Sequence, residues 1–202
     1  MKMVRACAAA LLSLSLAFTS GYSTSNAAPI EDSWFRSSQS DAYNYPLTPE
    51  EDPLAWATET EDVPALIEKL KIPNENLRAM SSPGLIETVL THPFLLNYLA
   101  FSNPQDGIEA VREQINALDV LLQRSDAAHA ILALYKSSDL QKIAESDTYP
   151  ASRLGFVELL LAQPEILDSL GAKGRALAVE AALDRWQQKT DFFEADFYGT
   201  ST

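Results

Sequence analysis

Apolar side chains along most of this chain recur at the three- and four-residue spacing of α-helices. The clearest stripe lies in the middle of the chain and consists of Ile108, Val111, Ile115, Leu118 and Leu122, with charged residues on the other faces. It predicts one amphipathic helix. A second stripe follows on a helix that Asp126 is expected to cap: Ala128, Ile131, Leu132 and Tyr135. No segment alternates with β-branched enrichment, so the sequence predicts no sheet.

The helices on either side follow from caps and from hydrophobicity. Asp62 is expected to cap one helix, and Ser82 another that has Pro83 at its first position. Residues 154–161 are apolar all round, which predicts a central, buried helix. The final helix, about residues 173–188, is expected to close the stack with one face: Val179, Ala182, Leu183 and Trp186.

Two segments of the chain resemble each other. Residues 84–99 align without a gap on residues 155–170, and the matched pairs are Gly84/Gly155, Glu87/Glu158, Leu90/Leu161, Pro93/Pro164, Leu96/Leu167 and Leu99/Leu170. A weaker copy lies around Ser125. The alternative is that any helical bundle shows leucine-rich helices ending at breaks. The repeat predicts an all-α fold of stacked helical pairs, either α-solenoid-like or an irregular helical bundle.

The first residues have the pattern of an export signal. Lys2 and Arg5 precede an apolar run over residues 6–18, and small residues lead up to Ala27. The pattern predicts a signal peptide over residues 1–27, cleaved after Ala27. The only cysteine, Cys7, lies within it, so the mature chain would have no cysteine and no disulfide. The expected location is secreted or periplasmic, in a bacterium.

The net charge limits the possible binding partners, and the distribution of residues along the chain suggests its domain organisation. The chain has a net charge of −13 at pH 7, and removal of Lys2 and Arg5 makes it more negative. This charge disfavours nucleic acid. No later segment is long and apolar enough for a membrane span. The expected organisation is an irregular acidic arm over residues 28–60, one helical-repeat domain over residues 61–189, and an acidic tail over residues 190–202.

Both termini of the mature chain are rich in aromatic residues among acidic ones. The candidate binding residues are Trp34, Phe35, Tyr43, Tyr45 and Trp56 in the arm, and Phe192, Phe193, Phe197 and Tyr198 in the tail. Two interpretations stand. The arms fold back as caps over the ends of the stack, or they bind a partner protein or stack on sugar rings.

Candidate catalytic chemistry is sparse. Two histidines, His92 and His129, form no metal-binding motif, so no metal or cofactor is expected. No nucleophile or phosphate-binding motif is present. Glu87 and Glu158 occupy equivalent repeat positions and could act as acid and base if they faced each other across a cleft. The alternative is that each carboxylate lies near a helix start because it interacts with the helix dipole there.

Part of the chain is similar to a group of exported bacterial helical proteins. The shared run begins with Met-Ser and a Leu-x-Glu-Thr core at residues 80–88, continues with Gly-x-x-x-Val at residues 107–111, and ends with Leu-x-x-Arg-x-Asp-Ala before an apolar helix at residues 121–135. The resemblance covers about residues 65–136. It implies bacterial export and a helical fold, and no activity, cofactor or site is associated with the group.

Three functions remain open from sequence. The favoured one is an exported, non-catalytic binding or scaffolding module for a protein or glycan. The second is a hydrolase acting on cell-envelope or extracellular polymer through Glu87, Glu158 or other acids. The third is a carrier of a small ligand in an apolar cavity lined by Phe156, Leu160 and Tyr98.

Overall fold

The computed structural model describes residues 34–36, 40–146 and 150–192, and the side chains of residues 144–146, 150–151 and 190–192 are outside the description. The described part is helical and contains no strand, which confirms the all-α prediction. The elements are α2 (Pro53–Glu59), η2 (Thr60–Asp62), α3 (Val63–Leu70), α4 (Asn74–Ala79), α5 (Ser82–Leu90), η3 (Leu95–Ala100), α6 (Pro104–Arg112), α7 (Asn116–Gln123), α8 (Ala127–Ser137), α9 (Leu140–Ser146), α10 (Pro150–Leu161) and α11 (Pro164–Phe192).

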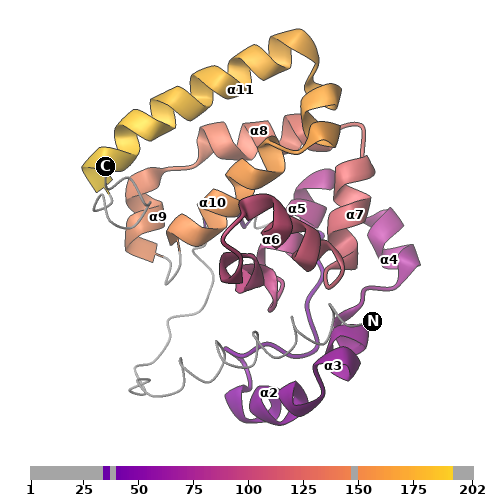
Figure 1. Ribbon diagram of the computed structural model, residues 1–202. Helices are drawn as coiled ribbons and strands as arrows, with labels where there is room; N and C mark the ends of the chain where they lie inside the picture. Colours follow the sequence, from indigo (N-terminus) through magenta and orange to yellow (C-terminus); the bar gives the residue numbers. More distant parts are fainter. Residues whose placement is uncertain (1–33, 37–39, 147–149, 193–202) are drawn as a thin grey trace.

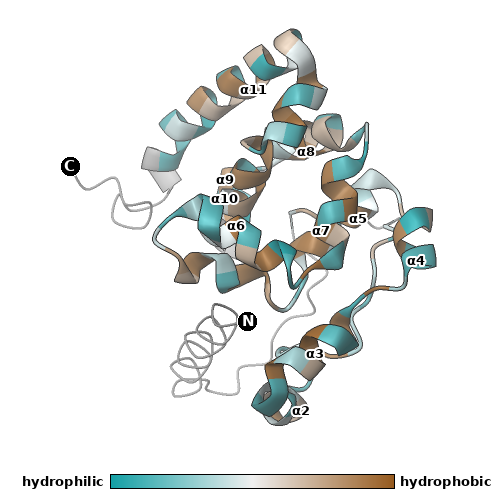
Figure 2. Ribbon diagram, turned by 45° about the vertical axis from the view of Figure 1, so that its right-hand side comes forward, coloured by the Kyte–Doolittle hydropathy of each residue, from teal (hydrophilic) through white to brown (hydrophobic). Residues whose placement is uncertain are grey.

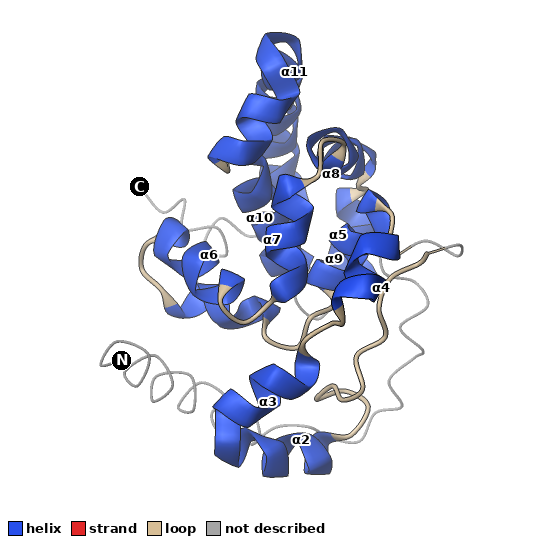
Figure 3. Ribbon diagram, turned by 90° about the vertical axis from the view of Figure 1, so that its right-hand side faces the viewer, coloured by secondary structure: helices blue, strands red, loops and turns tan. Residues whose placement is uncertain are grey.

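The helices form an irregular bundle with a recognisable order in space. The helices α2 and α3 lie at one end and α11 lies at the opposite end, as Figures 1 and 3 show. Between them, α8 packs against α5, α7, α10 and α11. The prediction that residues 154–161 form a central helix is confirmed, because Leu154, Phe156, Val157 and Leu160 of α10 are fully buried.

Four helices start with the same device, a polar cap followed by an early proline. The side chains of Asp52, Asp62, Ser81 and Asn103 accept hydrogen bonds from the first turns of α2, α3, α5 and α6. Asp62 is therefore confirmed as a cap. Ser82 is wrong by one position, because Ser81 makes the cap and the Ser82 hydroxyl donates to Asp126 at 2.6 Å. Asp126 consequently makes no side-chain cap on α8.

The middle of the chain is two helices where one was predicted. α6 ends at Arg112 and α7 begins at Asn116, although the whole apolar stripe is buried. The Asn116 side chain explains the break. It accepts from the Ile72 N–H at 3.2 Å and donates to the Ile72 carbonyl at 2.9 Å, so it holds the chain after α3 against the start of α7.

The two segments aligned in sequence break with the same backbone hydrogen bonds. Each break has three backbone hydrogen bonds that match at the offset of 71 residues. In the first segment the N–H groups of Thr91, His92 and Leu95 donate to the carbonyls of Glu87, Val89 and His92. In the second segment the N–H groups of Ala162, Gln163 and Ile166 donate to the carbonyls of Glu158, Leu160 and Gln163. The elements differ afterwards, since the 3-10 helix η3 follows the first break and α11 follows the second.

α11 consists of two segments that meet at Gly171. This glycine has φ 62° and ψ −178°, a conformation that is essentially confined to glycine. The segment before it packs inward through Ile166 and Leu170. The segment after it runs as a helix to Phe192, so the residues assigned to the tail begin in a helix.

The stretch of residues 40–47 is attached to α5 by polar and aromatic contacts. The Tyr43 N–H donates to the Thr88 hydroxyl at 2.9 Å, and the Tyr45 hydroxyl donates to the Thr88 carbonyl at 3.2 Å. The ring of Tyr45 meets His92 edge to face, with centroids 4.8 Å apart. His92 is buried, and its Nδ1 accepts from the Phe94 N–H at 3.0 Å. Burial lowers the pKa of His92 from 6.5 to about 3, so the ring is neutral in the fold.

We expect Gly107→Ala to destabilise the fold. A Cβ at residue 107 would lie 2.6 Å from the carbonyl oxygen of Tyr98, a backbone atom at the contact of α6 with η3. The overpacking should outweigh the gain in helix propensity and lower the free energy of unfolding by about 1–3 kcal/mol in urea denaturation. Gly155→Ala is the control, because its Cβ meets only the Tyr98 hydroxyl at 3.3 Å. Equal stability of Gly107→Ala and the parent chain would contradict the expectation.

The pH dependence of stability should carry the signature of His92. Between pH 6.5 and about 3 the unfolded chain binds a proton at this residue that the folded chain excludes. The stability contributed by the neutral ring is therefore complete above pH 6.5 and is lost as the pH falls toward 3. Within that window the parent chain should lose up to about 1.4 kcal/mol per pH unit more than His92→Asn.

The matched control for His92 is His129→Asn, because His129 is exposed on α8. The measurement is the free energy of unfolding in urea at a series of pH values for all three chains. His129→Asn should keep the slope of the parent chain. Equal slopes for His92→Asn and the parent chain would show that His92 takes up a proton in the folded state as readily as in the unfolded chain.

Candidate functional site

The two candidate catalytic carboxylates lie in different surroundings. Glu87, on α5, is 8% exposed and lines a small cavity of about 80 Å³ together with Phe35, Asp41 and Ser81. Glu158, on α10, accepts a hydrogen bond from the Tyr135 hydroxyl at 2.7 Å and one from Lys189 at 2.5 Å. Among the described residues, Glu158 does not line the cavity beside Glu87. Glu158 joins α8, α10 and α11 through these two bonds.

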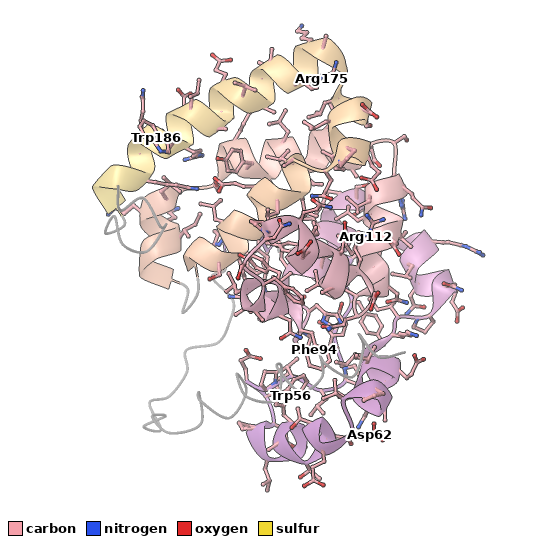
Figure 4. The ribbon with its side chains drawn as sticks, in the orientation of Figure 1. Trp56, Asp62, Phe94, Arg112, Arg175 and Trp186 are labelled. Carbon is pink, nitrogen blue, oxygen red and sulfur yellow. The ribbon has the colours of Figure 1, made fainter. Side chains whose placement is uncertain are left out.

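The aromatic residues of the arm lie against the core. Phe35 and Tyr45 are buried, and Trp34, Tyr43 and Trp56 are half-buried and pack on the same core. Trp56 of α2 meets Phe94 with ring centroids 5.4 Å apart, which joins α2 to the loop after α5 (Figure 4). In the tail, the side chain of Phe192 and the residues Phe193, Phe197 and Tyr198 lie outside the described part of the chain.

The residues considered for a ligand cavity fill the core instead. Phe156 and Leu160 are fully buried, and the ring of Tyr98 lies 5.2 Å from that of Phe156. The Tyr98 hydroxyl donates to the Ser152 carbonyl at 2.5 Å. Burial raises the pKa of the Tyr98 hydroxyl, and the negative charge of Glu158 raises it further. These three side chains line neither the cavity beside Glu87 nor a larger one on α8.

The larger of those two cavities is an open depression on one helix. It measures about 450 Å³ and is lined by α8 alone among the described residues, through His129, Leu132, Ala133, Lys136 and Ser137. Binding sites for small molecules usually enclose most of the ligand and converge several polar groups upon it. Among the described residues this depression is bounded by one helix face, so it lacks that enclosure.

The strongest surface feature is the outer side of α11 after Gly171. Val179, Leu183 and Trp186 are 61%, 58% and 60% exposed. The sequence predicted that this face closes the stack, and that prediction is wrong. Figures 1 and 2 show α11 at the edge of the bundle, and apolar positions recur along its length in Figure 2. We define the α11 outer stripe as Ala172, Ala176, Val179, Leu183 and Trp186.

The opposite face of α11 is turned toward the bundle, where the helix contacts α8. Gly174 and Ala181 are buried and Ala178 is half-buried. A helix turns about 100° per residue, so Val179 and Leu183 lie nearly opposite Ala181. A Cβ on Gly174 would lie 2.9 Å from the Leu170 side chain, so the glycine leaves room for the segment before Gly171. The larger apolar residues Val179, Leu183 and Trp186 of the second segment are exposed. The sequence signal for this arrangement was the second face of small residues, which the apolar stripe obscured.

Polar contacts fix the rotation of α11 about its own axis. The Arg185 guanidinium donates to the carbonyls of Tyr135 and Lys136 at 3.3 and 2.8 Å, where the last carbonyls of α8 lack helical partners. The Lys189 ammonium lies 2.5 Å from Glu158 and is only 12% exposed. Both cations point toward the bundle, so turning the α11 outer stripe inward would require both interactions to break.

Charged residues flank the α11 outer stripe on both sides. Arg175 and Lys189 lie on one side, and Lys173 and Glu180 lie on the other, as the helical geometry requires. Arg175, labelled in Figure 4, donates to the Leu167 carbonyl at 3.0 Å. The result is an apolar strip with polar edges on a single helix, the arrangement that a partner helix can cover.

Membrane and metal sites were examined over the same described residues. In that part of the chain no helix combines the length and the apolar content needed to cross a bilayer. Nor do three or more histidine, cysteine, aspartate or glutamate side chains gather there in a way that could hold a metal ion.

Comparison with known proteins identifies no relative. No family model, curated protein or solved structure matches the chain.

Proposed function

We propose that this chain is an exported, non-catalytic binding or scaffolding module that docks a helix of a partner protein on the α11 outer stripe. The observation that carries the proposal is the double-faced character of α11. On one face Gly174 and Ala181 are buried, and the other leaves Val179, Leu183 and Trp186 more than half exposed. Large apolar side chains grouped on one exposed helix face are typical of protein interaction sites.

The chemistry of the stripe favours a protein over a glycan. Sugar rings stack on aromatic faces and hydrogen-bond to polar groups beside them, whereas four of the five stripe residues are aliphatic. The spacing from Ala172 to Trp186 is four, three, four and three residues, which is the seam of a helix packed on a helix. Phe35 and Tyr45, which a glycan platform in the arm would use, are buried.

Burial of the stripe supports binding of modest strength. Covering a Val or Leu side chain contributes roughly 1.5–3 kcal/mol each when burial is complete, and Trp186 adds a larger area. Association itself costs an estimated 4–15 kcal/mol. A partner helix therefore needs the whole stripe and some polar edge contacts, which makes single substitutions in the stripe visible in affinity.

Export is part of the proposal and rests on the sequence. The signal pattern over residues 1–27 lies outside the described residues, and the resemblance of residues 65–136 to exported bacterial proteins points the same way. The net charge of −13 disfavours nucleic acid as the partner. A secreted or periplasmic protein partner fits both features.

A helical repeat is the architecture that we propose for the bundle. Residues 84–99 and 155–170 share six identities and the same three backbone hydrogen bonds at their breaks. Duplication of a helix–break–helix unit explains both the sequence match and the matched bonds. The different elements after the two breaks are then a later divergence.

The alternative of a carboxylate hydrolase has less support. A glycosidase needs two carboxyl groups on either side of the bond to be cut. Glu158 is bound to Tyr135 and Lys189, while Glu87 lines a cavity of about 80 Å³ at a different place in the fold. The 80 Å³ cavity at Glu87 is also far smaller than the usual small-molecule site of roughly 300–1,000 Å³.

Leu183→Asp tests the docking surface. Leu183 is 58% exposed, so the fold should survive while the stripe acquires a charge between Val179 and Trp186. The immobilised parent chain should retain partner proteins from the exported fraction of the producing cells. Leu183→Asp should retain those partners at least roughly tenfold less, given the lost burial of a leucine and the cost of burying a carboxylate.

Leu54→Asp is the matched control for this capture. Leu54 is 80% exposed on α2, at the end of the bundle opposite α11 in Figure 1. It removes an exposed leucine and adds the same charge. Circular dichroism and thermal unfolding establish that both variants fold. Retention of the same proteins by Leu183→Asp and the parent chain would overturn the α11 outer stripe as the docking surface.

A further inference from the structure

Side chains along the α11 outer stripe increase in size in one direction. From the beginning of the segment to its end the stripe reads Ala172, Ala176, Val179, Leu183 and Trp186. A helix that contacts the whole stripe at constant distance must therefore taper in the opposite direction. This requirement restricts the partner more than hydrophobicity alone does, because a uniform apolar helix would leave a gap beside the alanines or clash at Trp186.

A second copy of the same stripe, running in the opposite direction, places its large residues opposite the small ones. Ala176 and Trp186 lie five residues before and after Ala181, and Val179 and Leu183 lie two residues before and after it. In an antiparallel pair about a two-fold axis at the level of residue 181, Ala176 therefore meets Trp186 of the other copy. Val179 meets Leu183 in the same register. A parallel pair would instead place tryptophan against tryptophan and alanine against alanine.

We propose that a second copy of this chain occupies the α11 outer stripe, with the two helices antiparallel about a two-fold axis at the level of Ala181. The inference rests on the proposed function, since it names the partner of the same docking surface. An isologous contact of this kind uses one patch on both copies and closes at a dimer. The position of α11 at the edge of the bundle leaves its outer side accessible to a second copy (Figures 1 and 3).

The charges beside the stripe are compatible with this pairing, with one unfavourable contact. Arg175 comes near Lys189 of the second copy, but that ammonium lies 2.5 Å from Glu158 in its own chain. Arg175 therefore lies near the Lys189–Glu158 ion pair of the second copy, in which Glu158 offsets the charge of Lys189. On the other edge Glu180 comes near Glu180 of the second copy, close to the axis. This repulsion between like charges is specific to self-association in this register.

The size of the contact sets the expected strength. A single helix face from each copy buries less than the roughly 1,200 Å² of a standard interface. The dimer should therefore be weak, with a dissociation constant on the order of 10–100 μM. The parent chain should shift from monomer to dimer over this concentration range in sedimentation equilibrium. Leu183→Asp should remain monomeric, and Leu54→Asp should dimerise like the parent chain.

Cross-linking tests the antiparallel register independently of affinity. In a Cys7→Ser background, Ala182→Cys places a thiol beside the axis, and a short bismaleimide should join the two copies. Ala176→Cys is the matched control, since its two copies would stand roughly 15 Å apart along the axis at 1.5 Å per residue. Both alanines are exposed, so neither change disturbs the core. Preferential cross-linking at residue 176 would indicate a parallel pair and overturn the proposal.

Glu180→Gln provides a gain of association. Removal of the charge near the axis should tighten the dimer by roughly two- to fivefold at low salt, with a smaller gain at high salt. An unchanged or weaker dimer would overturn the register. A heterologous partner offers no reason for the same residue to face itself, so this variant also separates self-association from other docking.

The outcomes distinguish this inference from the proposed function. A chain that stays monomeric at concentrations well above 100 μM overturns self-association. If that monomer still captures partners in a way that Leu183→Asp abolishes, the docking surface stands and only its occupant changes. If capture is also insensitive to Leu183→Asp, both proposals fail. Dimerisation that persists in Leu183→Asp places the contact elsewhere and overturns this inference.

Discussion

The packing of the surrounding helices on α8 is the interaction on which the rest of the structure depends. α8 contacts α5, α7, α10 and α11, and its residues Ala127, Ala128, Ile131 and Tyr135 are buried. The only cysteine is Cys7, so no intramolecular disulfide can reinforce the bundle. Stability therefore comes from apolar burial and from the few polar groups that fix each helix in its place.

The same packing positions the candidate site. Gly174 and Ala181 are buried on the face of α11 turned toward the bundle, and Arg185 makes two hydrogen bonds to the end of α8. Glu158 connects Tyr135 and Lys189 across the neighbouring helices. With small and cationic residues directed inward, Val179, Leu183 and Trp186 remain on the outside. The exposed apolar strip is thus a consequence of how the core is built.

Local patterns predicted the helices better than their orientation. The all-round apolar character of residues 154–161 located a buried helix, since no face of it could meet water at low cost. The break at Asn116 was not predictable, because it depends on hydrogen bonds to Ile72, far away in the sequence. Asp126 has the residue type of a cap, but Ser82 from another helix occupies its carboxylate. Tertiary contacts decided both cases.

The candidate site was missed for a related reason. A helix with two apolar faces gives no local indication of which face is buried, and the usual rule favours the face with larger residues. Here that rule fails, because Gly174 and Ala181 are buried while Val179, Leu183 and Trp186 are exposed. The aromatic residues of the arm were equally misleading from sequence. Phe35 and Tyr45 look like a binding platform in an acidic stretch, yet they complete the core.

The direction of the α11 segment after Gly171 depends on a backbone conformation that the achiral residue glycine adopts readily. With φ at 62°, the chain there adopts a conformation that L-amino acids with a side chain resist, although no atom lies within 4 Å of the position where a Cβ would stand. The obstacle to any other residue is therefore intrinsic to the peptide and does not come from crowding. Substitution of Gly171 would therefore change the direction of the whole segment that follows. The orientation of the five side chains of the α11 outer stripe depends on the absence of a Cβ at this one residue.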